Sequence, residues 1–174
     1  GYFGSPVEPL LPVSMELKQE HRKLAAAVAI VMDRSGSMSM TAPGTNLQKI
    51  QLAAEGAARA IELLGDSDQV TVIPVDSAAH VIAPLAPLGP NRSQLTSLTR
   101  RIESTGGGIF VYTGLKAAWK ELQMAEVGQR HVILFADAND AEEPGEYVRL
   151  IDDMVKNKCT VSVIGMGTDH DVDA

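Results

Sequence analysis

An aspartate and two serines stand at alternate positions early in the chain, where residues 33–38 read Asp-Arg-Ser-Gly-Ser-Met. Asp33, Ser35 and Ser37 follow directly after an apolar run, so their oxygen atoms leave one strand tip together. Hard divalent cations such as Mg²⁺ are bound by oxygen ligands of this kind. The alternative is a polar turn in which Asp33 and Ser35 only cap backbone groups. On this short spacing alone the polar turn is the stronger interpretation.

A second carboxylate changes that balance, because the apolar run 131–136 also ends in an aspartate, Asp137. If the strands before Asp33 and Asp137 are central and parallel, both side chains emerge at the same edge of the sheet. Two carboxylates held close together without a cation repel each other, and the pKa of one rises. A bound divalent ion removes this conflict, so the pair favours a cation site.

The two loops must be positioned by the secondary structure around them, and the hydrophobic pattern predicts that strands and helices alternate along the chain. Short apolar runs predict strands at residues 24–32, 70–75, 132–136 and 160–164, and a short third strand contains Val81 and Ile82. Pro74 lies within the second strand and predicts a local irregularity or an unpaired strand side there. Four helices are predicted. The first is opened by a Thr45-x-x-Gln48 capping box and ends near Leu64, and the second runs from Asn91 through Leu95, Leu98 and Ile102. The third carries Leu115, Ala118, Trp119 and Leu122, and the fourth carries Tyr147, Ile151 and Val155.

This alternation predicts an α/β fold with a mostly parallel central sheet and helices on both faces. In such folds ligands bind beyond the carboxyl ends of the strands, where the strand order reverses. The residues that follow Met32, Ala136 and Ile164 are therefore the ones to examine for function.

Composition narrows the classes of protein further. The 174 residues are 45% hydrophobic, which favours one folded domain, and the net charge of −7 argues against general nucleic-acid binding. The single cysteine, Cys159, excludes an intramolecular disulfide and a cysteine-based zinc cluster. The longest apolar run, residues 24–32, is too short to span a bilayer, and no signal-peptide pattern is visible at the N-terminus.

Five separated segments, in order and with their spacing, resemble a von Willebrand factor type A domain of bacterial type: VAIVMDRSGSM, QVTVIPVDS, GGGIFVYTGL, HVILFAD and TVSVIGMG. The resemblance covers about residues 24–168. It implies a Rossmann-like fold with one short antiparallel edge strand and a metal-ion-dependent adhesion site. Carried over by position, Asp33, Ser35 and Ser37 would be first-loop ligands, and Asp137 the acidic residue of the fourth-strand loop. The implied cofactor is Mg²⁺, or Ca²⁺ or Mn²⁺.

The sequence departs from the family pattern at Ile109, which stands where the family usually supplies a threonine hydroxyl. Thr105 or Thr113 is a candidate to compensate, although Thr113 is better placed to cap the next helix. The acidic residues at 140, 142 and 143 are interpreted as a solvated loop before a helix rather than as ligands. Residues 1–23 are assigned as a linker or extended arm, or the end of a neighbouring domain. Residues 24–174 are assigned as the type A domain, with its last helix and strand apparently missing.

Three functions stay open at this point. The first is a non-enzymatic protein-binding module whose cation is completed by an Asp or Glu carboxylate of a partner, with Arg34 turned to solvent. Met38, Met40, Phe110 and Tyr112 would lie around the rim, and burial of Phe110 and Tyr112 under the loop is an equally good interpretation. The second is a scaffold domain of a larger membrane-associated bacterial protein with a degenerate metal site. The third is a Mg²⁺-dependent hydrolase, which needs a general base, and the sequence places neither a histidine nor a lysine near either loop.

Overall fold

The computed structural model describes residues 25–108, 110–137 and 145–166. Expectations for the 1–23 arm, Ile109, the acidic residues at 140–143 and the end of the chain lie outside this described part. The strands are β1 (Ala26–Asp33), β2 (Gln69–Val75), β3 (Ala83–Pro87), β4 (Gln129–Ala136) and β5 (Cys159–Gly165). The helices are α1 (Lys49–Leu63), α2 (Arg92–Arg100), α3 (Val111–Gln123) and α4 (Tyr147–Lys156), with short 3-10 turns η2 (Gly36–Ser39) and η3 (Gly89–Asn91).

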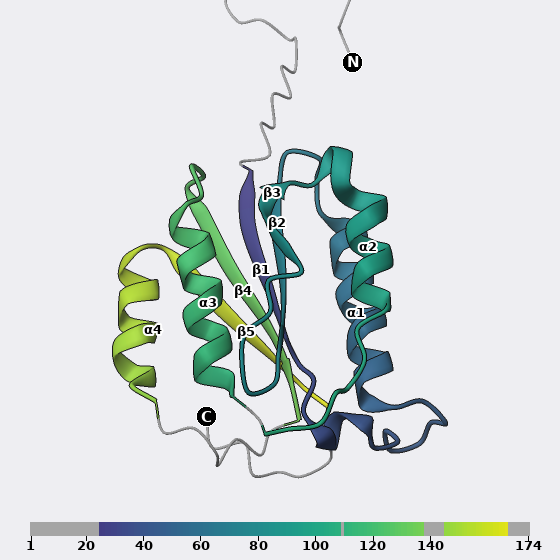
Figure 1. Ribbon diagram of the computed structural model, residues 1–174. Helices are drawn as coiled ribbons and strands as arrows, with labels where there is room; N and C mark the ends of the chain where they lie inside the picture. Colours follow the sequence, from purple (N-terminus) through teal and green to yellow (C-terminus); the bar gives the residue numbers. More distant parts are fainter. Residues whose placement is uncertain (1–24, 109, 138–144, 167–174) are drawn as a thin grey trace, which may run out of the picture.

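The five described strands form one sheet in the order β3-β2-β1-β4-β5, shown in Figure 1. β1 pairs in parallel with both β2 and β4, β4 pairs in parallel with β5, and only β3 is antiparallel. The predicted mostly parallel sheet with an antiparallel edge strand is therefore confirmed. The chain leaves β1 toward β2 and later returns on the other side as β4. The carboxyl ends of β1 and β4 are thus the point where the strand order reverses.

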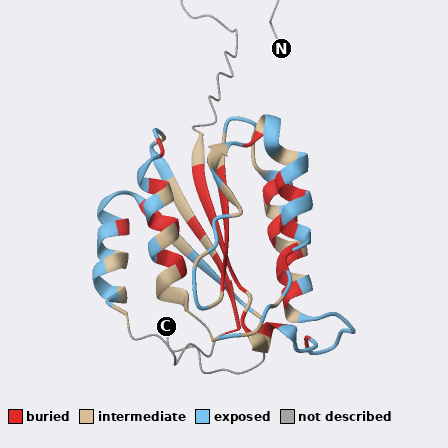
Figure 2. Ribbon diagram, in the orientation of Figure 1, coloured by how far each residue is buried: buried red, intermediate tan, exposed pale blue. Residues whose placement is uncertain are grey.

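Helices cover both faces of the sheet, α1 and α2 on one face and α3 and α4 on the other (Figure 1). β1 is buried along almost its whole length, as expected of a central strand packed on both sides (Figure 2). Alternate residues of β1 divide between the two halves of the core. Ile30 and Met32 pack with Ile50 and Leu95 on the first face, and Val31 packs with Leu115, Trp119 and Met154 on the second.

Two local predictions were wrong. The capping box belongs to Gln48 and Gln51, with the Gln48 amide donating to Gln51 Oε1 at 2.9 Å, and not to Thr45. Residues 41–48 first form a small closed loop, in which the Ala42 amide donates to the Leu47 carbonyl, so the helix begins only after it. The third strand was predicted to contain Val81 and Ile82, but it starts at Ala83. Ile82 lies just before the strand, and its amide donates to the Val72 carbonyl at 3.1 Å.

Pro74 lies within β2 as predicted, and its position explains why a proline is tolerated there. The pairing with β3 ends at Val72–Ala83, after a register shift between Val70 and Val72. Beyond that point the Pro74 carbonyl accepts from the His80 amide, and no ladder hydrogen bond is needed from the proline nitrogen on that side.

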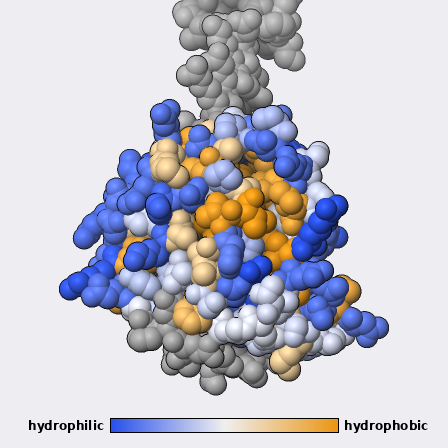
Figure 3. Space-filling view, viewed as in Figure 1, coloured by the Kyte–Doolittle hydropathy of each residue, from blue (hydrophilic) through white to orange (hydrophobic). Residues whose placement is uncertain are grey.

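Apolar side chains reach the surface beside the edge strand β3, where Figure 3 shows an orange area near the centre of the view. A groove of about 220 Å³ lies between β3 and α2, with Ile82, Pro84, Leu95 and Leu98 among its lining residues. No helix in the described part of the chain is both long and apolar enough to cross a membrane.

α3 packs closely on the sheet at Gly114, and this contact gives a testable prediction. A Cβ added at Gly114 would lie 2.7 Å from Val75 Cγ2 and 2.8 Å from Val31 Cγ1. We predict that Gly114→Ala lowers the free energy of unfolding by about 1–3 kcal/mol, the usual cost of overpacking. Alanine's advantage of roughly 1 kcal/mol within a helix offsets only part of this cost.

Urea denaturation measures the effect, with Gly128→Ala as the matched control because its added Cβ meets no atom within 4 Å. Equal stability of the Gly114 variant and the wild type would show that α3 can move off the sheet without cost.

Candidate metal centre

Asp33 is the last residue of β1, and its side chain is held by the loop that follows it. The Ser35 amide donates to Asp33 Oδ1 at 2.8 Å, and Ser35 Oγ donates to Asp33 Oδ2 at 3.0 Å. Ser35 Oγ also lies 3.0 Å from Ser37 Oγ. Both Asp33 and Ser35 are buried. The structure therefore brings the three predicted first-loop residues into one continuous chain of oxygen atoms.

Asp137 follows β4, and the pairing of Met32 with Phe135 places it at the same edge of the sheet as Asp33. Its side chain is also buried. Asp137 Oδ2 accepts from the Lys49 ammonium at 3.0 Å, whereas Oδ1 is buried and has no hydrogen-bond partner among the described residues. A buried carboxylate oxygen without a partner is costly, and this atom is left available as a ligand atom.

The electrostatics of Asp33 point the same way. Burial is the largest cause that raises its pKa, and the negative charge of Asp137 adds to it; against opposing hydrogen bonds from Ser35, the pKa rises to about 6. The two carboxylates are therefore close enough to repel each other, as the sequence predicted. Oxygen ligands from two carboxylates and two hydroxyls match the preference of a hard divalent cation. The described residues contain no cluster of three or more His, Cys, Asp or Glu, so a site here depends on the serines.

A glycine-containing segment between α2 and α3 packs on the serine loop from the side. Ser104 Oγ donates to the Ser35 carbonyl at 2.6 Å, and the Gly36 amide donates to the Gly107 carbonyl at 3.3 Å. The Thr105 amide donates to the Arg34 carbonyl at 3.1 Å. These bonds fix the backbone that carries Ser35 and Ser37.

Asp76, directly after β2, joins three loops around the candidate site. Its carboxylate accepts from Arg34 Nε at 2.9 Å, from Thr105 Oγ1 at 3.2 Å and from the Ala78 amide at 3.0 Å, and lies 3.0 Å from His80 Nε2. Burial by itself would raise the pKa of Asp76, but the bonds from His80, Ala78 and Arg34 together hold it well below its usual range. Arg34 was predicted to extend into solvent, but its side chain is bound to Asp76 instead.

Neither of the two threonines that were candidates to replace the missing hydroxyl is bonded to Asp33 or Ser35 in the hydrogen bonds given above. The Thr105 hydroxyl is directed to Asp76 rather than to Asp33 or Ser35. α3 begins at Val111 with Phe110 as its N-cap residue, so Thr113 lies in the first turn of the helix and is not its N-cap residue. The N-cap prediction for Thr113 was wrong because the helix starts three residues earlier than a cap at Thr113 would place it.

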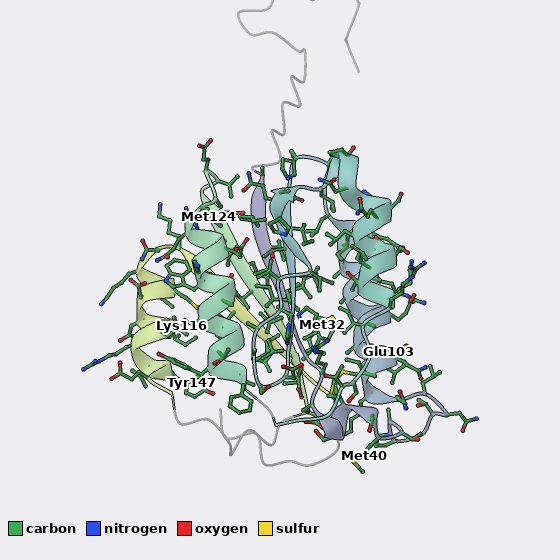
Figure 4. All side chains as sticks on the ribbon, in the orientation of Figure 1. Met32, Met40, Glu103, Lys116, Met124 and Tyr147 are labelled. Atoms are coloured by element: carbon green, nitrogen blue, oxygen red, sulfur yellow. The ribbon has the colours of Figure 1, made fainter. Side chains whose placement is uncertain are left out.

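The residues expected at the rim divide between surface and core. Met40 is 61% exposed and projects beyond the strand ends in Figure 4. Met38 is fully buried, and Phe110 packs against the core beside α3. Tyr112 stacks edge-on against Tyr147, with ring centroids 5.3 Å apart. Trp119 is buried, and its indole Nε1 donates to Asp153 Oδ2 at 2.7 Å.

The sequence of residues 28–139 matches the family model of the von Willebrand factor type A domain, a match that includes both Asp33 and Asp137. The chain belongs to this family. Type A domains are in general interaction modules, and many bind a divalent metal. No curated protein matches the chain significantly.

Solved structures share the type A fold at low sequence identity. BatB from Bacteroides thetaiotaomicron has a TM-score of 0.68 and 21% identity over 81% of this chain and 66% of its own length. An aerotolerance-related membrane protein from Bacteroides fragilis has a TM-score of 0.69 and 16% identity over 86% of this chain and 75% of its own. A von Willebrand factor type A protein from Catenulispora acidiphila has a TM-score of 0.68 and 24% identity, covering 81% of this chain and 33% of its own.

Sequence reasoning missed two residues of this type A domain that shape the candidate site, Asp76 and Lys49. Asp76 stands at the carboxyl end of a parallel strand, as do Asp33 and Asp137, so the expectation that functional residues lie at these strand ends identifies it as well. Lys49 stands at the first position of α1, where the helix dipole disfavours a cation. A lysine in that position is a signal that a carboxylate lies nearby.

The Asp76 contacts predict a pH-dependent stability. Asp76→Asn preserves the shape of the side chain but removes its charge, and we expect a loss of about 1.5–3 kcal/mol near neutral pH, as for hydrogen bonds to charged groups. The folded-state pKa lies below the ordinary value of 3.8, so the carboxylate's contribution is complete above that value and is lost as the pH falls below it. The stability gap between wild type and variant should therefore narrow toward about pH 3.

Denaturation across this pH range tests the prediction, with Asp152→Asn, an exposed residue of α4, as a control for the change in charge. A gap that is the same at every pH would show that shape, and not charge, makes Asp76 important.

Proposed function

We propose that this type A domain is a metal-dependent protein-binding module in which Asp33, Ser35, Ser37 and Asp137 hold a divalent cation, Mg²⁺ or alternatively Mn²⁺ or Ca²⁺. The observation that carries the proposal is the buried, unpartnered Asp137 Oδ1 beside a second buried carboxylate whose pKa is raised. Both features are unfavourable in a purely structural turn and are relieved by a cation.

The residues present fit such a cation. Ser35 holds the Asp33 carboxylate in place through its amide and hydroxyl, and η2 positions the Ser37 hydroxyl beside it. The Ser104 and Gly107 contacts fix this loop before any ligand binds. A bound divalent cation would supply a fixed positive charge that a partner's carboxylate can coordinate.

The partner proposed is a protein that offers an Asp or Glu side chain. The chain carries a net charge of −7, so an acidic partner gains no attraction from the overall charge of the protein. A local cation is then the feature that makes a carboxylate a suitable ligand. The exposed Met40 beside the site provides an adaptable apolar contact for the surrounding surface of the partner.

Binding is favoured over catalysis by the placement of the described histidines. His80 is bonded to Asp76, and His131 is bonded to Thr160 at the β4–β5 pair. Neither of them contacts Asp33 or Asp137 through a hydrogen bond, so a hydrolase reading lacks a positioned imidazole base in the described part of the chain.

We also propose that the domain is part of a larger membrane-associated bacterial protein, with residues 1–23 as a linker or arm. The support is the fold shared with a Bacteroides fragilis structure described as an aerotolerance-related membrane protein.

The metal site gives a direct prediction. Calorimetric titration of the metal-stripped protein should show saturable binding of Mg²⁺ or Mn²⁺ to one site. Asp33→Asn should weaken that binding by more than the roughly 10–100-fold that follows loss of an outer-shell partner, because it removes a charged ligand. Asp152→Asn makes the same change of charge on the exposed surface of α4 and should bind like the wild type.

Circular dichroism confirms that the Asp33 variant is folded, which is expected because asparagine still accepts from the Ser35 amide. Equal metal binding by the Asp33 variant and the wild type would place the cation elsewhere and refute the proposed site.

The partner chemistry is tested with peptides selected on the immobilised domain in the presence of Mg²⁺. Selected peptides should depend on one acidic residue, and replacing it with Asn or Gln should remove binding, as should a chelator. Peptides that bind equally well in the chelator would support the scaffold function instead.

A further inference from the structure

The Lys49 side chain lies inside the candidate metal site and was not anticipated there. α1 begins with Lys49, and the N-terminal end of α1 lies at the edge of the sheet where β1 and β4 end (Figure 1). Its Nζ is 3.0 Å from Asp137 Oδ2, and only 15% of the Lys49 side chain and 3% of the Asp137 side chain are exposed. Being the first residue of α1, Lys49 meets the positive end of the helix dipole. The contact with Asp137 offsets that unfavourable position.

We propose that Lys49 is an internal counter-ion which competes with the divalent cation for Asp137. This inference rests on the proposed metal site and identifies the residue that sets its affinity. In the metal-free protein the ammonium neutralises one of the two buried carboxylates. When the cation binds, Lys49 gives up Asp137 Oδ2 and moves toward solvent.

Charge explains why the two cations compete. Asp33 and Asp137 together offer two negative charges when ionised, and the Lys49 ammonium cancels one of them. A divalent ion entering beside the ammonium meets a like charge at close range, as well as a carboxylate that is already engaged. Charges at such distances shift proton affinities by about 1–3 pK units, and a comparable penalty applies to a metal ion that binds the same carboxylates.

The chemistry of lysine suits this exchange. An ammonium on a flexible four-carbon stem can leave one carboxylate and regain water without moving the backbone. Asp137 Oδ1, the unpartnered oxygen, is available from the start, so a cation has a buried ligand atom to engage before the ammonium leaves Oδ2. Lys49 therefore prevents carboxylate repulsion in the empty site at the expense of metal affinity.

Titration calorimetry on the metal-stripped chain tests the proposal with Mg²⁺ and Mn²⁺. Lys49→Met keeps the length of the side chain and removes its charge, and it should bind either metal about tenfold more tightly than the wild type, or more. Lys49→Arg keeps the charge and should bind no more tightly than the wild type. Lys116→Met, on the exposed face of α3, changes the net charge equally and should leave the affinity unchanged.

Each outcome separates this inference from the proposed metal site. Equal affinity of wild type and Lys49→Met would overturn the counter-ion role while leaving the metal site intact. Binding by Lys49→Met alone would support the counter-ion role and show that the wild-type site is too weak to fill. Absence of binding in both proteins would overturn the metal site and the counter-ion role together.

A second measurement uses the wild-type protein, in case Lys49→Met does not fold without metal. Amine labelling followed by mass spectrometry reports the reactivity of Lys49 with and without saturating Mg²⁺, with Lys116 as the internal reference. Lys49 should become several-fold more reactive when the metal binds. Unchanged Lys49 labelling in a protein that calorimetry shows to be metal-bound would overturn the displacement.

Discussion

The burial of two carboxylates, Asp33 and Asp137, at one edge of the sheet is the constraint on which the chemistry of the candidate site depends. It follows from the topology, because β1 and β4 are parallel neighbours and deliver their terminal residues to one edge of the sheet. Each carboxylate loses most of its hydration there, and their mutual repulsion adds to the cost of burial. Ser35, Lys49 and the orphaned oxygen of Asp137 are the local responses to this conflict.

The loops around this pair are held by bonds that do not involve the two carboxylates. Asp76 ties the loops after β1 and β2 to the segment before α3 through Arg34, His80 and Thr105. Ser104 adds a bond to the backbone of the serine loop. Below them, α3 packs so closely on β1 and β2 that Gly114 leaves no room for a methyl group. The site is therefore preorganised, and the side chain expected to move is that of Lys49, because its stem is long and flexible.

The sequence predicted the parts of this structure that follow from the hydrophobic pattern of the strands and helices and from the order of the strands. Unbroken apolar runs identified the buried strands, and the strand-end rule placed Asp33 and Asp137 together. It did not predict the start of α1, because Thr45 carries a sound capping pattern that loses to the closed loop of residues 41–48. Nor did it predict the partners of Arg34, Thr105 and Lys49, since these contacts join residues that are 29 to 88 positions apart. Such pairings depend on three-dimensional geometry that no local pattern encodes.

The scaffold and binding functions differ in what they require of Asp137. A domain that only supports a larger chain gains nothing from a buried carboxylate with one oxygen unsatisfied, a feature that usually costs about 1–3 kcal/mol. An apolar residue would fill the same space at lower cost. The unsatisfied oxygen stands beside a second buried carboxylate and a lysine that neutralises only one charge. This combination leaves an open ligand atom beside a second carboxylate, and it is the feature of the fold that supports the proposed binding function over the scaffold function.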